Sequence, residues 1–314
     1  MKSISRLQFL KRFGAAFVAV AGFKKEFFEL FAKEGPQMLH RIVPKTGETI
    51  PAIGLGTWQT MDISSDSSEL KNLREVWKEF LNHGGTVVDS SPMYGRSEET
   101  VGVLTSELQE EYRRKIFYAT KVWTRGESAG KIQINSSFQK LKTDTIDLFQ
   151  IHNLLDTQTH LKTLSSFKER GKIRYIGLTH YVSSAFSEME RIAKSEPIDF
   201  LQVPYSIVTR EAEERILPFA ESNGIAVLIN RPFEEGELFR RVRGKDLPDY
   251  FKEWDCETFG HAFLKFILSH TAVTCAIPAT SKLSHLKDNM KAGYGKIPEG
   301  KDRDEFRKRL LQVF

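Results

Sequence analysis

The chain has few cysteines and no cysteine motif for metal binding. Cys256 and Cys275 are the only two, they lie 19 residues apart, and neither belongs to a C-x-x-C pair. Zinc sites and small disulfide frameworks need several cysteines at regular spacings. We therefore interpret both residues as structural thiols, and we predict no metal site.

A general excess of basic side chains is also missing from most of the chain. The net charge is +5 over 314 residues, but residues 1–25 contain six basic side chains and no acidic one. Residues 26–314 therefore carry a net charge of −1. Because nucleic-acid binding depends on many contacts between a basic face and phosphates, this distribution argues against a nucleic-acid partner.

No apolar run reaches the length of about 20 residues that a membrane-spanning helix needs. The N-terminus instead has a basic head, a short run rich in Ala, Val and Phe, and the small residues AVA at 19–21. This order is typical of a bacterial export signal, so we predict a leader over residues 1–21 with cleavage after Ala21. Residues 5–11 (SRLQFLK) resemble a twin-arginine signal in which Leu7 replaces the second arginine. The leader favours a periplasmic protein.

The alternative is that this segment stays attached as an amphipathic helix of a cytoplasmic protein. In either case residues 22–39 are predicted to be a helix or linker, and residues 40–314 a single large domain. The composition, 40% hydrophobic and 28% charged, suits a globular domain with a sizeable core.

The body of the chain alternates short apolar runs with segments of helical periodicity, as at 70–81, 160–170 and 211–221. Eight runs are predicted to be strands: 52–55, 86–89, 116–120, 146–151, 174–178, 200–203, 226–229 and 274–277. Strands that alternate with helices form a parallel sheet, and eight such units close into an α/β fold of the (β/α)8 TIM-barrel type.

Three further segments complete the predicted architecture. Residues 40–50 alternate apolar and polar side chains around a K-T-G-E turn, which predicts a β-hairpin capping the bottom of the barrel. The long gap between the seventh and eighth strands is predicted to be an inserted loop. Residues 303–311 have the pattern of a terminal amphipathic helix.

Polar residues stand at four of the predicted strand ends, where TIM barrels carry their active sites. They are Asp89 with Tyr94, Lys121, His152 and, within the sixth strand, Gln202. An ammonium beside a phenol lowers the phenol's pKa, and a carboxylate keeps the ammonium charged. This set predicts a proton donor for a carbonyl oxygen, with a nicotinamide cofactor to supply hydride, because no side chain can.

Six segments together resemble the aldo-keto reductase superfamily: 88–98 (VDSSPMYGRSE), 119–123 (ATKVW), 146–153 (IDLFQIHN), 172–178 (KIRYIGL), 201–205 (LQVPY) and 276–289 (AIPATSKLSHLKDN). The resemblance runs from about Ile42 to about Tyr294. It implies a (β/α)8 aldo-keto reductase domain within residues 40–314 that reduces aldehydes or ketones without metal. We expect this domain to be a monomer. In the family pattern, Tyr94 is the general acid, Lys121 tunes its pKa, Asp89 holds Lys121, and His152 orients the carbonyl.

The same resemblance implies positions for NADP(H), with NAD(H) as the alternative. The implied cofactor residues are Thr179, His180, Gln202, Arg231, Thr280, Ser281, Lys282, His285 and Asn289. Several depart from the common pattern: Thr179-His180 replaces Ser-Asn, Asn230 replaces a stacking aromatic, and Ala279 and His285 replace a Lys and an Arg. Arg231 is expected to reach a phosphate or acidic substrate, or to pair with an acid in the following loop. Trp58, Met93 and Trp123 are implied to wall the substrate pocket.

The sequence is also compatible with two other functions. The first is a regulatory subunit that binds the nucleotide and turns over slowly, as channel-associated members of the superfamily do. The second is a metal-dependent barrel hydrolase or lyase. That class needs several His and carboxylate ligands at the mouth, where only His152 and Asp89 are clear candidates.

Overall fold

The computed structural model describes residues 37–64 and 67–314 of the chain. The predicted leader, its twin-arginine-like segment and nearly all of the predicted linker lie outside these residues. Residues Met38–Phe314 form one compact unit. Among the described residues, no helix combines the length and the apolar character needed to cross a bilayer.

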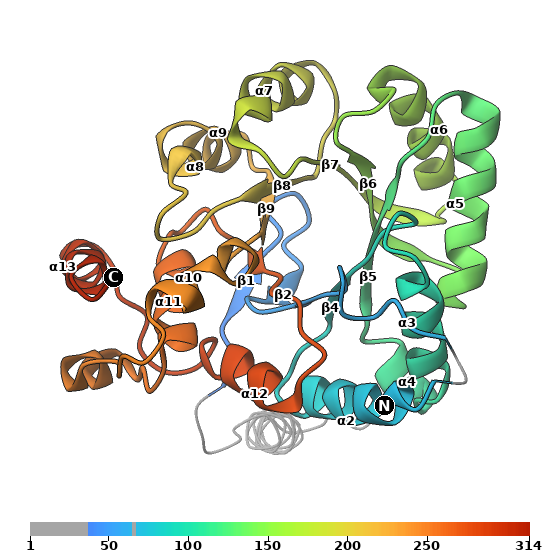
Figure 1. Ribbon diagram of the computed structural model, residues 1–314. Coiled ribbons are helices and arrows are strands. Elements are labelled where there is room, and N and C mark those ends of the chain that lie inside the picture. Colours follow the sequence, from blue (N-terminus) through green and yellow to red (C-terminus); the bar gives the residue numbers. More distant parts are fainter. Residues whose placement is uncertain (1–36, 65–66) are drawn as a thin grey trace, which may run out of the picture. The chain divides into compact units, whose positions relative to one another are not determined.

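Eight parallel strands surround the centre of this unit (Figure 1). They are β3 Leu55–Gly56, β4 Val87–Asp89, β5 Phe117–Val122, β6 Ile146–His152, β7 Ile173–Thr179, β8 Phe200–Pro204, β9 Ala226–Asn230 and β10 Cys275–Ala276. They are hydrogen-bonded in chain order from β3 to β10. Parallel bridges from Ile53 to Ala276 and from Gly56 to Ala279 join the last strand to the first. The predicted (β/α)8 barrel is therefore confirmed.

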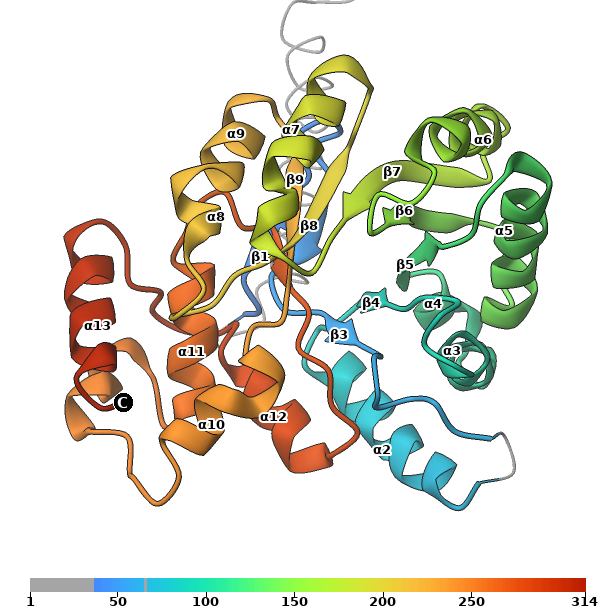
Figure 2. The same ribbon diagram turned by 45° about the horizontal axis from the view of Figure 1, so that its top comes forward.

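Helices cover the outside of the strands, as both ribbon views show (Figures 1 and 2). The α-helices are α2 Glu69–Asn82, α3 Ser97–Ser106, α4 Glu110–Arg113, α5 Glu127–Leu141, α6 Thr157–Glu169, α7 Phe186–Ser195, α8 Glu211–Glu214, α9 Ile216–Ser222, α10 Glu237–Arg241, α11 Phe259–Leu268, α12 Leu283–Lys291 and α13 Lys301–Leu311. Helix α2 illustrates how these helices pack on the strands. Its buried residues are all apolar and recur at spacings of three and four: Leu70, Leu73, Val76, Trp77 and Phe80.

Two predicted segments differ in detail from the structure. The helix predicted over 211–221 is interrupted at Arg215, whose φ of −140° and ψ of −69° are not helical, so it becomes α8 and α9. The insertion between β9 and β10 is more ordered than a loop. It contains α10, α11 and the short 3-10 helices Glu234–Gly236 and Asp249–Trp254, and it packs beside α13 (Figure 2). A further 3-10 turn, Ser183–Ala185, precedes α7.

Side chains inside the barrel form an apolar layer below a polar one. Along each strand, alternate residues point inward. The inward set includes Phe117, Leu148 and Phe200, which are buried in one cluster at the amino-terminal half of the barrel. Two to four residues further along the same strands, the inward positions are polar. Because side chains alternate between the two faces of each strand, the polar residues at the strand ends also face inward, at the mouth of the barrel.

The antiparallel hairpin, β1 His40–Ile42 with β2 Thr49–Pro51, closes the amino-terminal end of the barrel. Val43 and Ile50 belong to the interior apolar cluster. The Tyr175 hydroxyl donates to Glu48 at 2.5 Å and lies 2.8 Å from the Thr46 hydroxyl. Apolar packing and these two polar contacts therefore attach the hairpin to the barrel, as the sequence predicted.

Candidate active site

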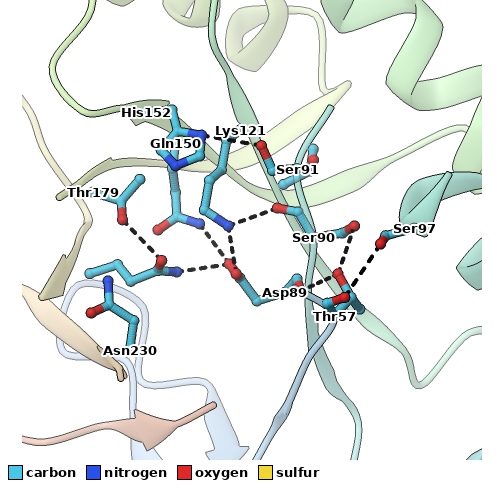
Figure 3. Close-up of polar contacts among 12 residues, drawn as sticks. Thr57, Asp89, Ser90, Ser91, Ser97, Lys121, Gln150, His152, Thr179 and Asn230 are labelled. Atoms are coloured by element: carbon cyan, nitrogen blue, oxygen red, sulfur yellow. Dashed lines mark hydrogen bonds and ion pairs between the residues drawn. The ribbon is translucent and has the colours of Figure 1, made fainter. Parts of the chain in front are cut away.

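Four predicted site residues, Asp89, Tyr94, Lys121 and His152, come together at the carboxyl end of the barrel and are called the tetrad below. Figure 3 shows Asp89, Lys121 and His152. Asp89 is the last residue of β4, and His152 is the last residue of β6. Lys121 lies within β5 rather than after it. Tyr94 lies in the turn between β4 and α3. The four side chains therefore belong to three neighbouring strands and one connecting segment.

Lys121 is fully buried, and its ammonium contacts the oxygen atoms of Asp89 and Ser90. Its Nζ lies 2.5 Å from Asp89 Oδ2 and donates to the Ser90 carbonyl at 2.8 Å. Burial lowers the pKa of this ammonium, but the charges of Asp89 and Tyr94 raise it, and the net direction is upward. Lys121 therefore stays protonated at neutral pH. Its Nζ lies 4.8 Å from the centre of the Tyr94 ring.

Asp89 accepts hydrogen bonds from three side chains. Besides Lys121, the amide nitrogens of Gln150 and Gln202 donate to Oδ1 at 3.0 and 2.8 Å. Gln202 also accepts from the Thr179 hydroxyl at 2.9 Å. These contacts hold the carboxylate in one place, and charge-assisted bonds of this kind are among the stronger ones in proteins.

The sequence predicted Gln202 at the site but not Gln150. Gln150 is two residues before His152 in the same strand, so the two side chains share the inner face. The spacing of two residues from His152 was the feature of the sequence that could have identified Gln150 as a site residue.

Tyr94 is positioned by a tight turn. Its amide donates to the Ser91 carbonyl at 3.0 Å, and the next residue, Gly95, has φ of +61°. A Cβ on Gly95 would lie 2.3 Å from the Asp62 carboxylate, so only glycine fits there. The turn aims the phenol at the cavity without a regular element.

The pKa of Tyr94 differs from the sequence-based expectation. Burial raises the pKa of the phenol above its ordinary value of 10, and Lys121 lowers it by less than burial raises it. The expectation of a phenol more acidic than the free side chain is therefore wrong for the protein alone, because desolvation is the larger effect. Tyr94 is fully protonated at neutral pH, as a proton donor must be.

His152 is neutral over the physiological range. Burial lowers its pKa to about 3, and the positive charges of Lys121 and His180 act in the same direction. The ring stands nearly perpendicular to the Tyr94 ring, with centroids 6.0 Å apart. A neutral imidazole offers one hydrogen-bond donor and one acceptor at this position.

A cavity of about 990 Å³ opens above these residues. Tyr94, Asp89 and His152 line it, and so do Thr280, His285 and Asn289 from the segment after β10. Its outer wall is aromatic and apolar: Trp58, Met93, Trp123, Tyr181, Phe233 and Phe239. The three predicted substrate-side residues, Trp58, Met93 and Trp123, all belong to this wall and are 40–41% exposed.

The predicted cofactor residues divide into two groups. The cavity lining includes Thr179, Gln202, Arg231, Thr280, His285 and Asn289. His180, Ser281 and Lys282 are not part of the lining. The ring of His180 turns to the backbone, where Nδ1 accepts from the amides of Tyr181 and Val182.

Arg231 pairs with acids of its own loop. Its guanidinium nitrogens lie 3.7 Å from Glu234 and 3.2 Å from Glu235. The alternative that the sequence left open, an ion pair with the following acidic residues, is therefore the arrangement found. Arg231 also has a φ of +53°, an uncommon conformation for a residue with a side chain.

Several cavity residues were not predicted from the sequence. Asn153, Tyr181, Asn230 and Asp288 line it, and the Oδ1 atoms of Asn153 and Asn230 are buried without a hydrogen-bond partner. Asn153 directly follows His152, and Asn230 ends β9 as His152 ends β6. Position at a strand end was the signal for both.

The comparisons with known proteins give the family. The model of the Aldo/keto reductase family matches residues 52–299. The chain belongs to the aldo/keto reductase family. This match and the similarity to named reductases make the protein an NAD(P)H-dependent oxidoreductase.

Named relatives span most of the chain. The aldo-keto reductase YhdN of Bacillus subtilis (strain 168) is 29% identical over 69% of this chain and 68% of its own. The methylglyoxal reductase YeaE of Escherichia coli (strain K12) is 24% identical over 80% of this chain and 89% of its own. A solved aldo/keto reductase of Klebsiella pneumoniae, in complex with NADP and acetate, superposes with a TM-score of 0.71 at 23% identity, over 85% of this chain and 94% of that one. The last likeness supports the barrel fold.

Proposed function

We propose that the protein reduces an aldehyde or ketone to an alcohol, with Tyr94 as the proton donor to the carbonyl oxygen. The observation that carries this proposal is the close placement of the buried Lys121 beside both Asp89 and Tyr94, which line the cavity. A protonated phenol beside a fixed positive charge is suited to a reaction in which negative charge develops on a nearby oxygen.

The charge of Lys121 makes proton donation easier at the moment it is needed. In the resting site Tyr94 stays protonated because burial disfavours the phenolate. As the proton leaves, the phenolate gains attraction from the ammonium, which Asp89 holds in place. Lys121 thus stabilises the phenolate that develops in the transition state more than the protonated phenol of the ground state, which is the condition for catalysis.

His152 lies at the same mouth and serves a different purpose. Since its pKa is about 3, it is not a proton source at neutral pH. A neutral imidazole can instead donate one hydrogen bond to the carbonyl oxygen, orient it and polarise its bond. Trp58, Met93 and Trp123 provide an apolar wall for the rest of the carbonyl compound.

The residues of the cavity fit a nicotinamide cofactor. The buried Oδ1 of Asn230 lacks a donor, and a carboxamide NH2 is a suitable one. Thr179 and Gln202 line the same cavity, and Thr280, His285 and Asn289 add polar groups from the segment after β10. When bound, the reduced cofactor supplies the hydride. No arginine is present among the residues after β10 that line the cavity, so we propose binding of NADPH with NADH accepted as well.

The test is reduction of a panel of small aldehydes and ketones by the purified protein with NADPH or NADH, followed as loss of cofactor absorbance. We expect turnover with apolar and aromatic carbonyl compounds, and a loss of turnover in Tyr94→Phe. Tight cofactor binding without turnover on any compound would contradict carbonyl reduction and support the regulatory alternative. Equal rates in the wild type and the variant would exclude Tyr94 as the acid.

A further inference from the structure

The Ser91 hydroxyl contacts the imidazole ring of His152. Its Oγ lies 3.2 Å from Nδ1 of His152, and both residues are buried, Ser91 completely (Figure 3). Ser91 is separated from His152 by 61 positions in the chain. The contact therefore joins the segment after β4 to the end of β6.

The surroundings of the Ser91 hydroxyl decide which atom donates. The Met93 amide lies 3.3 Å from Ser91 Oγ. Because an N–H group can only donate a hydrogen bond, Ser91 Oγ is the acceptor in this contact. The hydroxyl proton then needs an acceptor of its own. Among the described residues, His152 Nδ1 is the one acceptor within hydrogen-bond distance of it. A buried hydroxyl proton without a partner is costly, so the proton points to Nδ1.

The other ring nitrogen faces the reaction space. His152 lines the cavity, and its Nε2 makes no hydrogen bond to the described part of the chain. A neutral imidazole carries one proton, and the pKa of about 3 keeps this ring neutral. If Nδ1 accepts from Ser91, the ring proton must be on Nε2.

We propose that Ser91 is a positioning residue that holds His152 in the tautomer with its proton on Nε2. In this tautomer the Nε2–H group can donate a hydrogen bond to the carbonyl oxygen. The role rests on the proposed function, because the donor matters only if a carbonyl oxygen binds there. With the proton on Nδ1 instead, Nε2 would present a lone pair to the carbonyl oxygen and repel it.

The same residue also supports the general acid. The Ser91 carbonyl accepts the amide of Tyr94 at 3.0 Å, so its backbone shapes the turn that carries the phenol. Its side chain orients the imidazole, and its backbone orients the tyrosine segment. One short segment thus sets the relative placement of the two groups expected to meet the same oxygen.

The direct test is nitrogen NMR of the full chain labelled with 15N-histidine, with His152 assigned by the spectrum of His152→Gln. We expect a protonated Nε2 and a hydrogen-bonded, unprotonated Nδ1 in the wild type. In Ser91→Ala, the Nδ1 signal should move toward that of a free unprotonated nitrogen. In the control Ser90→Ala, whose hydroxyl contacts Thr57 rather than the imidazole, the His152 signals should not move. A wild-type proton on Nδ1, or unchanged signals in Ser91→Ala, would overturn the proposal.

Kinetics give a second and separable readout. Ser91→Ala should lower kcat about tenfold, the effect of one lost hydrogen bond, with the cofactor Kd unchanged. Ser91→Cys keeps the size of the side chain but has a weaker donor, so its kcat should fall between the two. A wild-type rate in Ser91→Ala would overturn the role. If the wild type reduces no carbonyl compound, the proposed function fails, and the nitrogen signals still decide whether Ser91 sets the tautomer.

Discussion

Replacing Lys121 by methionine is the sharpest perturbation of the proposed proton donor. The substitution keeps the length of the side chain and removes its charge, which lies 4.8 Å from the centre of the Tyr94 ring. At that distance and an effective dielectric constant of about 20, a unit charge contributes about 3 kcal/mol. We therefore expect the rate of carbonyl reduction to fall about two hundredfold.

The same substitution also has a cost in stability. Asp89 is 3% exposed and loses its ion pair. Breaking a buried pair typically costs 3–5 kcal/mol. Because Gln150 and Gln202 still donate to the carboxylate, we expect the lower end, about 3 kcal/mol in the free energy of unfolding.

Lys265 provides a matched control for the loss of a buried lysine. It is also fully buried, and its Nζ donates to the carbonyls of Trp254, Tyr294 and Lys296, away from the cavity. Lys265→Met should destabilise the protein but leave kcat per folded molecule within about twofold. The assay is single-turnover cofactor oxidation at saturating carbonyl compound, with urea unfolding of each variant. A Lys121→Met rate within fivefold of the wild type would refute the electrostatic reasoning.

Three further predictions concern the pH dependence of the reaction, the hairpin and the N-terminal segment expected from the sequence. The kcat/KM for reduction should stay flat between about pH 5 and pH 9, because the pKa of Tyr94 is raised above 10 and that of His152 is lowered to about 3. A kcat/KM that falls with rising pH near neutrality would contradict this, since it would mean that the phenol loses its proton there. Tyr175→Phe should lower the free energy of unfolding by about 1 kcal/mol and leave kcat unchanged, since its hydroxyl bonds the hairpin residues Thr46 and Glu48 at the closed end of the barrel; a fall in kcat in a steady-state assay would argue against a purely structural hairpin. Expression in a bacterial host should give a periplasmic monomer that begins at residue 22, as measured by intact mass and gel filtration; a chain that retains residues 1–21 in the cytoplasm would favour the attached helix.

Most of the barrel could be predicted because the sequence repeats one physical pattern. Each of the eight apolar runs became a strand, and glycines marked the ends of the preceding helices, as at Gly84 and Gly171, both of which have positive φ. The break at Arg215 could not be predicted, because the apolar spacing continues through 211–221 and does not reveal a backbone kink. The helices of the long insertion were missed for a related reason: α11 packs against β10, α12 and α13, which all lie further along the chain.

The tetrad could be predicted because its members stand at successive strand ends, where barrel geometry brings them together. Gln150 and Asn153 were missed because a polar side chain near a strand end can equally face solvent or bind the backbone, and the sequence alone does not show that both reach the site. Whether the pKa of Tyr94 is raised or lowered also could not be predicted without the structure. Whether burial or Lys121 has the larger effect depends on how completely the phenol is enclosed, and spacing in the sequence does not contain that information.

The most direct test of the account is the rate of hydride transfer in Tyr94→Phe under single-turnover conditions, with cofactor affinity measured in parallel by fluorescence titration. Removing the hydroxyl leaves the ring, and the charge of Lys121 remains paired with Asp89. We expect unchanged cofactor affinity and a loss of at least a hundredfold in the rate of reduction, the range that a general acid contributes. Reduction at the wild-type rate in the variant would show that the proton comes from another group and would contradict the central claim.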